Sequence, residues 1–205
     1  MKPFLIAVAG PSCSGKSELS KVLQRELRAP VLSLDSYYRE LAHLPLEVRA
    51  LANFDEPAAL DEDLLIGQVR SLAEGRVIER PVYDFARHTR SGEAERVEPS
   101  EYVIVEGLFA LYWPQLRESY DASVFIDVDD EVCYRRRLER DVRERGRTAE
   151  SVYAQYNGTV RPMAERYILP SRAWADVVVS GVEPLEQSSA AVLAHVARAF
   201  SRPIW

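Results

Sequence analysis

The chain has 205 residues and a formal net charge of −6 at pH 7, with 47% hydrophobic and 28% charged residues. These values are typical of one globular domain with a substantial core, and the negative charge argues against general attraction to nucleic acid or anionic membranes. The longest N-terminal apolar run is too short for a signal peptide, no run is long enough to span a bilayer, and two cysteines suggest no disulfide framework, so we expect a cytoplasmic protein.

Residues 10–17, Gly-Pro-Ser-Cys-Ser-Gly-Lys-Ser, match the phosphate-binding loop pattern of Gly, four variable residues, Gly, Lys and Ser or Thr. A strand is predicted before this loop, at residues 4–9, and a helix after it, at residues 18–27. The backbone N–H groups and the helix dipole then converge where a polyphosphate would bind. A glycine turn with an unrelated lysine does not explain this context. The predicted phosphate-binding residues are Gly10, Ser12, Cys13, Ser14, Gly15, Lys16 and Ser17.

Within this loop, Lys16 would neutralise the outer phosphates and the Ser17 hydroxyl would hold Mg²⁺. The simpler interpretation of Cys13 is a small filler, and a reactive thiol at a helix N-terminus is the alternative. A second short strand, residues 31–34, ends at Asp35. Because the carboxyl ends of strands face the ligand crevice in an open α/β sheet, we expect Asp35 beside the phosphate loop. Its alternative role is to cap the next helix.

An irregular stretch at residues 43–57 precedes a helix that Asp61 is expected to cap and that ends near Gly75. Residues 76–82 look like a strand with which Val97 could pair. The polar loop between them contains two aromatic residues and a histidine, a composition that suits a small-molecule pocket. A surface hairpin is the alternative. We therefore predict a small antiparallel insertion at about residues 76–98.

Buried parallel strands are predicted at residues 102–105, 123–128 and 176–179, and the last helix at residues 185–200. Glu106, at the end of one strand, is a candidate Mg²⁺ partner, whereas the acids near residue 129 more simply cap a helix. The five parallel strands and their connecting helices predict an α/β fold with a doubly wound five-stranded sheet, in a single domain over residues 1–205.

Seven arginines and three acids alternate between residues 135 and 147. In a continuous helix, Arg136, Arg140, Arg143 and Arg147 would share one face. A solvated helix with internal ion pairs is one interpretation. Beside a nucleotide site, however, arginines can close over a transferring phosphoryl group, and we predict a helical lid at about residues 137–155. A further helix, residues 151–166, should be kinked at Pro162.

The ordered motifs of the chain resemble the uridine kinase (uridine–cytidine kinase) family of P-loop nucleoside kinases. The phosphate loop alone is typical of a whole superfamily, whereas the combination in this order is specific. The resemblance covers about residues 4–179. Its blocks are residues 10–17, Asp35-Ser-Tyr-Tyr-Arg, Asn53-Phe-Asp, Tyr83-Asp-Phe with His88-Thr-Arg, Glu106-Gly, Arg136-Arg-Leu-Glu-Arg-Asp, Glu144-Arg-Gly-Arg, Gln155-Tyr and Ala175-Asp-Val-Val.

This resemblance implies transfer of the γ-phosphoryl group of ATP, or of GTP, to the 5′-hydroxyl of uridine or cytidine in pyrimidine salvage. It also implies a homo-oligomer, with a tetramer expected. The implied catalytic residues are Asp35 as general base, Lys16, Arg140 and Arg145; Ser17, Glu106 and Asp35 order Mg²⁺; Asp55, Tyr83, Phe85, His88, Arg137, Arg147 and Gln155 bind the nucleoside.

Two alternatives stay open from the residues themselves. One is a kinase of another small hydroxylated metabolite on the same scaffold, and the other is a regulator that hydrolyses nucleoside triphosphates slowly. The sequence lacks the Asn-Lys-x-Asp signature of guanine-specific switches. A role in nucleic-acid binding through the arginines is disfavoured by the net charge and the interspersed acids.

Overall fold

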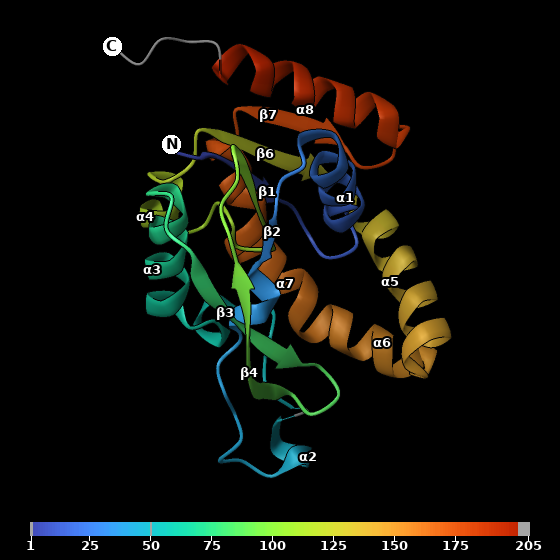
Figure 1. The fold of residues 1–205 in the computed structure, drawn as a ribbon. Coiled ribbons are helices and arrows are strands. Elements are labelled where there is room, and N and C mark those ends of the chain that lie inside the picture. Colours follow the sequence, from blue (N-terminus) through green and yellow to red (C-terminus); the bar gives the residue numbers. More distant parts are fainter. Residues whose placement is uncertain (1, 50, 201–205) are drawn as a thin grey trace.

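The computed structural model describes residues 2–49 and 51–200, so residues 1, 50 and 201–205 of the predicted domain lie outside the described part. Five parallel strands form the central sheet in the order β2-β5-β1-β6-β7, which confirms the predicted doubly wound arrangement (Figure 1). The strands are β1 (Phe4–Ala9), β2 (Val31–Ser33), β5 (Tyr102–Glu106), β6 (Ala122–Asp127) and β7 (Val177–Ser180).

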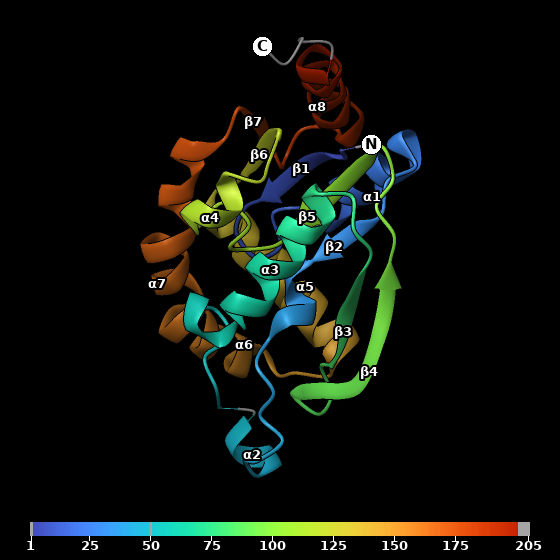
Figure 2. The same ribbon diagram turned by 60° about the vertical axis from the view of Figure 1, so that its left-hand side comes forward.

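Both faces of the sheet are covered, because alternate residues of the strands point into two separate hydrophobic clusters. In β1, residues Phe4, Ile6 and Val8 pack into one cluster, and the residues between them pack into the other. The helices on the two faces lie apart in Figures 1 and 2. The first face carries α1 (Lys16–Leu27) and α8 (Leu185–Phe200), and the second carries α3 (Glu62–Ala73) and α4 (Pro114–Arg117).

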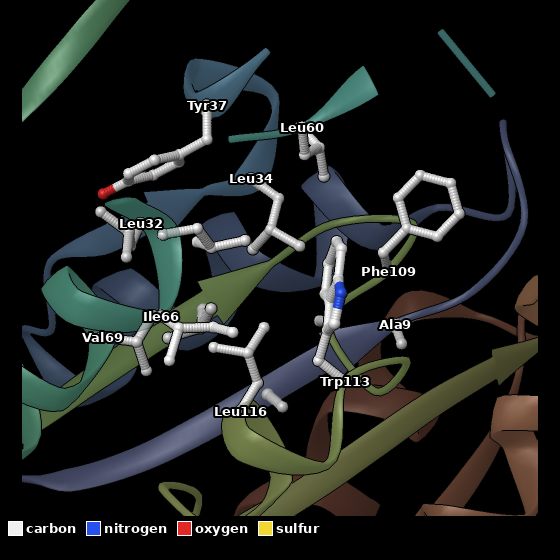
Figure 3. Packing of buried hydrophobic residues seen from close by; sticks show 14 of the residues in the cluster. Ala9, Leu32, Leu34, Tyr37, Leu60, Ile66, Val69, Phe109, Trp113 and Leu116 are labelled. Carbon is white, nitrogen blue, oxygen red and sulfur yellow. The ribbon is translucent and has the colours of Figure 1, made fainter. Parts of the chain in front are cut away.

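The second cluster is the larger one, and Figure 3 shows part of its packing. Leu34 and Trp113 face each other there beneath the short helical turn that follows β2. That turn, η1 (Leu34–Tyr37), contains Asp35. Because Leu34 and Tyr37 are almost completely buried, the turn is anchored and the position of Asp35 is fixed by core packing.

A two-stranded antiparallel sheet, β3 (Ile78–Asp84) and β4 (Thr89–Val97), forms the insertion that the sequence predicts. β3 is as long as the strand predicted at residues 76–82 but begins and ends two residues later, so it includes Tyr83, which was expected in the loop. Asp84 ends the strand because its carboxylate accepts hydrogen bonds from the next backbone N–H groups, those of Ala86 and Arg87.

The arginine-rich segment forms α5 (Asp130–Arg145), which ends at Gly146 in the left-handed conformation, with φ of 63°. The expectation that Arg147 shares a helix face with Arg136 is therefore wrong, because the backbone turns before Arg147. Arg143 is exposed and pairs with Glu139 and Glu144, as a solvated helix face would.

After the turn, α6 (Ala149–Gln155) opens a helical run that is longer than the predicted 151–166. Pro162 lies in α7 (Arg161–Met163) between two π-helical turns, so the wider turns surround the proline, which has no N–H to donate. Within the described ranges, no helix has the length and apolarity needed to cross a membrane. The other helical segments are α2 (Leu46–Arg49), η2 (Pro57–Ala59), η3 (Tyr156–Val160), η4 (Ala164–Ile168) and η5 (Leu169–Trp174).

Candidate active site

The loop between β1 and α1 has the backbone that its glycines predict. Gly10 and Gly15 have φ values of 151° and 105°, in the region that favours glycine. A Cβ atom at Gly10 would lie 2.8 Å from both the Ile126 carbonyl oxygen and the Ser14 hydroxyl. The loop therefore packs against β6 at a distance that only glycine allows, and Gly15 starts α1 with its N-terminal N–H groups directed at the loop.

Lys16 is the one cation buried inside this loop among the described residues: it is 8% exposed and its Nζ donates to the Pro11 carbonyl at 2.8 Å. Burial lowers the pKa of Lys16, while Glu106 and Asp35 act in the opposite direction. The ammonium group thus lies between the loop backbone and two carboxylates, where an anion would strengthen its charged form.

The ends of three neighbouring strands bring the two carboxylates to this loop. Glu106 pairs in register with Val8 of β1 and with Ser33 of β2, and Asp35 follows Ser33 by two residues. Desolvation raises the pKa of Asp35 and of Glu106, and Lys16 opposes this for both. The Ser17 hydroxyl donates to the Glu106 carboxylate at 3.3 Å.

The donor set at this point consists of oxygens only. The described part of the chain contains no group of three or more His, Cys, Asp or Glu side chains that could hold a metal. Two carboxylates and a hydroxyl fit Mg²⁺ nevertheless, because this ion usually takes one or two carboxylates and completes its octahedron with substrate phosphates and water. The residues present therefore fit a magnesium ion carried in with a nucleotide.

A cavity of about 1350 Å³ runs from the phosphate loop to the hairpin β3–β4. Its size is above the usual range for a drug-sized ligand and can hold two substrates side by side. Of the predicted site residues, only Gly10 is absent from its lining. The others are Ser12, Cys13, Ser14, Gly15, Lys16, Ser17, Asp35, Asp55, Tyr83, Phe85, His88, Glu106, Arg137, Arg140, Arg145, Arg147 and Gln155.

Aromatic rings form the wall of the cavity far from the phosphate loop. His88 stacks on Phe54 with ring centres 5.4 Å apart and planes 21° apart. Tyr38 packs edge-on against Phe54 at 5.3 Å and lies at the same distance from Tyr83. Phe85 is exposed but its ring contacts Tyr83 at 5.2 Å. The Tyr83 hydroxyl is buried and has no hydrogen-bond partner within the described residues, so a ligand in the cavity could provide one.

Two buried residues of opposite charge, Asp55 and Arg137, lie between this wall and the loop, and both are less than 9% exposed. Burial raises the pKa of Asp55 and Arg137 opposes the shift. Arg137 donates to the Ser12 hydroxyl and to the Gln155 side-chain oxygen, each at 3.1 Å. Gln155 also accepts from Arg147, so it joins the two arginines.

A family model described as "Phosphoribulokinase / Uridine kinase family" matches residues 5–186. This chain belongs to that family. It is 42% identical over 181 residues to a uridine kinase of Ligilactobacillus salivarius, with 87% of this chain and 85% of the relative covered. It is 44% identical to a uridine kinase of Shewanella piezotolerans, over 85% of this chain and 86% of the relative.

A solved structure shares the fold of this family member. The protein described as a putative fructose transport system kinase from Silicibacter has a TM-score of 0.71 at 24% identity, with 87% of this chain and 90% of that chain covered. At this level of identity, the likeness concerns the fold alone.

Sequence reasoning missed several cavity residues of this kinase-family chain. Tyr38 and Phe54 lie in the motifs around Asp35 and Asp55, but nothing in the pattern assigns their rings to the cavity wall. Arg136 was taken only as part of an arginine face, whereas it donates to the Gly181 carbonyl at 2.8 Å and to the Cys13 carbonyl at 3.4 Å. It therefore ties the loop after β7 to the phosphate loop.

Proposed function

We propose that this chain is an ATP-dependent uridine/cytidine kinase that transfers the γ-phosphoryl group to the nucleoside 5′-hydroxyl, giving UMP or CMP. GTP is the alternative donor. The observation that carries the proposal is the single cavity: a phosphate loop lies at one end, an aromatic wall with a histidine lies at the other, and Asp35 lies between them. The relatives named uridine kinase, which match most of this chain, support it independently.

Asp35 is the proposed general base for the 5′-hydroxyl. The phosphoryl-transfer transition state is loose, so the hydroxyl loses its proton late and a carboxylate is a sufficient base. Desolvation raises the pKa of Asp35, and Lys16, Arg145 and Arg140 oppose that shift. Ser17, Glu106 and Asp35 would hold Mg²⁺, which supplies neutralisation of phosphate charge when bound. The four P-loop residues Ser12, Cys13, Ser14 and Gly15 would contact the phosphates through their backbone.

Asp55 and Arg137 are proposed to hold the ribose. A carboxylate can accept two hydrogen bonds from the cis 2′- and 3′-hydroxyls, and the burial of Asp55 makes an unpaired oxygen there unfavourable. A 2′-deoxyriboside would leave one oxygen of the carboxylate unpaired. The site should therefore discriminate against deoxyuridine.

The aromatic wall is proposed to hold the pyrimidine. His88, stacked on Phe54, can donate or accept at the 4-position depending on its tautomer. Uracil presents an acceptor there and cytosine a donor, so one histidine can serve both bases. The unpaired Tyr83 hydroxyl offers a second polar contact, and Phe85, Arg147 and Gln155 complete the nucleoside end.

The same proposal treats the chain as one kinase domain with a β insertion at about residues 76–98 and a lid at about residues 137–155. It also takes the enzyme to be cytoplasmic. We also expect a homo-oligomer, which the exposed apolar side chains of Leu46, Val48 and Leu51 support. Light scattering during size-exclusion chromatography tests this expectation, and a monomer at micromolar concentration would contradict it.

The test of function is ADP release with ATP and Mg²⁺, measured with uridine, cytidine, deoxyuridine, adenosine or no acceptor. We expect turnover with uridine and cytidine only. Asp35→Asn should lower kcat by roughly 10²–10⁴-fold, the usual contribution of a general base. ADP release that needs no acceptor and is unchanged in Asp35→Asn would instead indicate a slow nucleotide hydrolase. Turnover with another hydroxylated metabolite alone would indicate a different kinase.

Folding provides the control for Asp35→Asn. Because the pKa of Asp35 is raised in the folded state, its stabilising contribution is present below the unfolded pKa and is lost as pH rises through the folded pKa. At neutral pH an ionised Asp35 in this desolvated position destabilises the folded state, and a neutral asparagine removes that penalty. The melting temperature of the variant should therefore be equal to or above that of the wild type. A clear fall in melting temperature would mean that lost activity reflects misfolding.

A further inference from the structure

Asp141, in the last turns of α5, is a carboxylate with no exposed surface. Four arginine side chains surround it, although one would be enough to balance its charge. A buried ion is stable only when it is paired, and here one carboxylate is shared by several guanidinium groups. The closest nitrogen–oxygen distances are 2.8 Å to Arg140, 3.4 Å to Arg147, and 3.6 Å to both Arg137 and Arg145.

These four arginines fall into two classes by their other contacts. Arg137 and Arg147 are also held elsewhere, by Ser12 and Gln155 in the first case and by Gln155 and the Ser151 carbonyl in the second. Arg140 and Arg145 pair only with Asp141 among the described residues. Their side chains are 32% and 53% exposed and line the cavity. Within residues 2–49 and 51–200, Asp141 is thus the one side chain that holds the second class at the cavity edge.

The backbone of Asp141 acts on the same structure. Its carbonyl accepts hydrogen bonds from Gly146 and, at 3.1 Å, from the backbone N–H of Arg147. These bonds close the turn between α5 and α6, where Gly146 takes its left-handed conformation. One residue therefore organises both the turn and the guanidinium groups on either side of it.

The charge balance at this point is positive, because one carboxylate cannot neutralise four guanidinium groups. Asp35 is also near, since Arg145 and Arg140 both lower its pKa. Arg140 and Arg145 share a single carboxylate, that of Asp141, so they can also bind an anion that enters the cavity. Guanidinium groups form bidentate contacts with phosphate as readily as with carboxylate.

We propose that Asp141 is the positioning residue of the lid. Its carboxylate holds Arg140 and Arg145 at the edge of the cavity, where both can contact the phosphates of the donor, and it braces Arg137 and Arg147 on the nucleoside side. Asp141 itself contacts neither substrate. The role in phosphoryl transfer rests on the proposed function, whereas the role in holding guanidinium groups at an anion site does not.

The kinetic test compares Asp141→Asn with Glu139→Gln, which removes an exposed carboxylate from the same helix. Arginines that stabilise transferring phosphoryl groups contribute about 10³–10⁵-fold to kcat, so their misplacement in Asp141→Asn should lower kcat by about 100-fold or more. The uridine KM should stay within about fivefold, because Arg137 keeps Ser12 and Gln155 as partners. Glu139→Gln should retain kcat within about twofold, as is usual for an exposed ion pair.

A second readout is independent of turnover. Loss of the buried charge should lower the melting temperature by about 6–20 °C. Inorganic tripolyphosphate should then raise the melting temperature of Asp141→Asn less than that of the wild type, because Arg140 and Arg145 are no longer held where they can contact the anion. If the wild type does not turn over uridine, the proposed function fails, yet this measurement still tests the role of Asp141.

Two results would overturn the proposal. One is a folded Asp141→Asn variant with wild-type kcat, and the other is a tripolyphosphate shift in that variant as large as that of the wild type. If Asp141→Asn does not fold, Asp141→Glu replaces it in the kinetic test. That variant keeps the charge but displaces it by one methylene, and a displacement of about 1 Å can lower a rate by about 100-fold. Wild-type kcat in folded Asp141→Glu would equally contradict the proposal.

Discussion

The phosphate loop and the nucleoside end of the cavity are held in place by different means. The loop is fixed by backbone packing: Gly10 approaches β6 at a distance that excludes any side chain, and buried Lys16 donates to the Pro11 carbonyl of the loop. The nucleoside end is fixed by side chains from distant segments, such as Phe54 on His88 and Gln155 between two arginines.

This difference implies a difference in tolerance. Changes in the loop should act on the free energy of unfolding and on both substrates together, because backbone shifts move every group of the site. Changes at the nucleoside end should act on one substrate and leave the fold intact, because each side chain there makes only local contacts at the cavity wall.

The largest effect is expected at Gly181, in the loop that Arg136 ties to the phosphate loop. A Cβ atom at this position would lie 2.2 Å from Val128 Cγ2 and 2.4 Å from the Ser14 carbonyl. Gly181→Ala should lower the free energy of unfolding by about 3 kcal/mol, the upper part of the range for overpacking. It should also raise the KM of ATP and of uridine together. Urea denaturation and steady-state kinetics measure the two effects.

Gly158→Ala is the matched control for Gly181→Ala, because a Cβ atom there meets nothing within 4 Å. Gly158 lies in a helical turn, so alanine should leave activity unchanged and raise stability by about 0.5–1 kcal/mol. If Gly181→Ala were as stable and active as Gly158→Ala, the phosphate loop would not depend on close backbone packing.

A smaller effect, confined to one substrate, is expected for Phe54→Ala. This change removes the ring on which His88 stacks and against which Tyr38 packs. Such aromatic pairs contribute about 0.5–1.5 kcal/mol each, so the uridine KM should rise roughly tenfold while the ATP KM stays within about twofold. The control is Phe200→Ala, which also loses two ring contacts, to Phe4 and Tyr102, outside the cavity. Equal rises in both KM values would contradict the separation of the two ends.

The smallest effect is a shift in pH dependence. The pKa of Asp35 is raised, and a general base must be ionised, so activity should fall on the acid side at a pH above the ordinary value of 3.8. Because the pKa of Glu106 is raised too, the fall in activity on the acid side reports the coupled titration of Asp35 and Glu106. Arg145 lowers the pKa of Asp35, so Arg145→Gln should move this acid-side fall in activity to higher pH. If the pH of this fall is the same in Arg145→Gln and the wild type, Arg145 of the lid does not influence the ionisation of Asp35.

The fold could be predicted from the sequence because its signals are local. Apolar runs predict the parallel strands, and the glycine pattern predicts the loop and its conformation. The role of Asp141 could not be predicted in this way, because a segment rich in arginines and acids has the same pattern whether its carboxylate points to solvent or is buried. Tyr38 and Phe54 were missed for a related reason: their contacts join segments far apart in the chain.

The boundaries of elements show the same limit. The left-handed conformation of Gly146 separates Arg147 from the helix, and the Asp141 carbonyl stabilises that turn by accepting from the backbone N–H groups of Gly146 and Arg147. The strand β3 extends through Tyr83 because the Asp84 carboxylate, rather than a glycine or proline, forms the turn. Gly146 carries the usual signal for a helix end, which the repeated arginines obscured, whereas the extension of β3 has no strong sequence signal.

Cys13 offers a practical consequence of the loop geometry. It is partly exposed in the cavity lining, whereas Cys133 is 1% exposed and burial raises its thiol pKa to about 11. A thiol-specific fluorophore should therefore label the native protein at a single position without any engineered cysteine, since the thiolate is the reactive form. The dye would lie beside the phosphate loop, so the unmodified sequence already contains an attachment point for an optical sensor of that site.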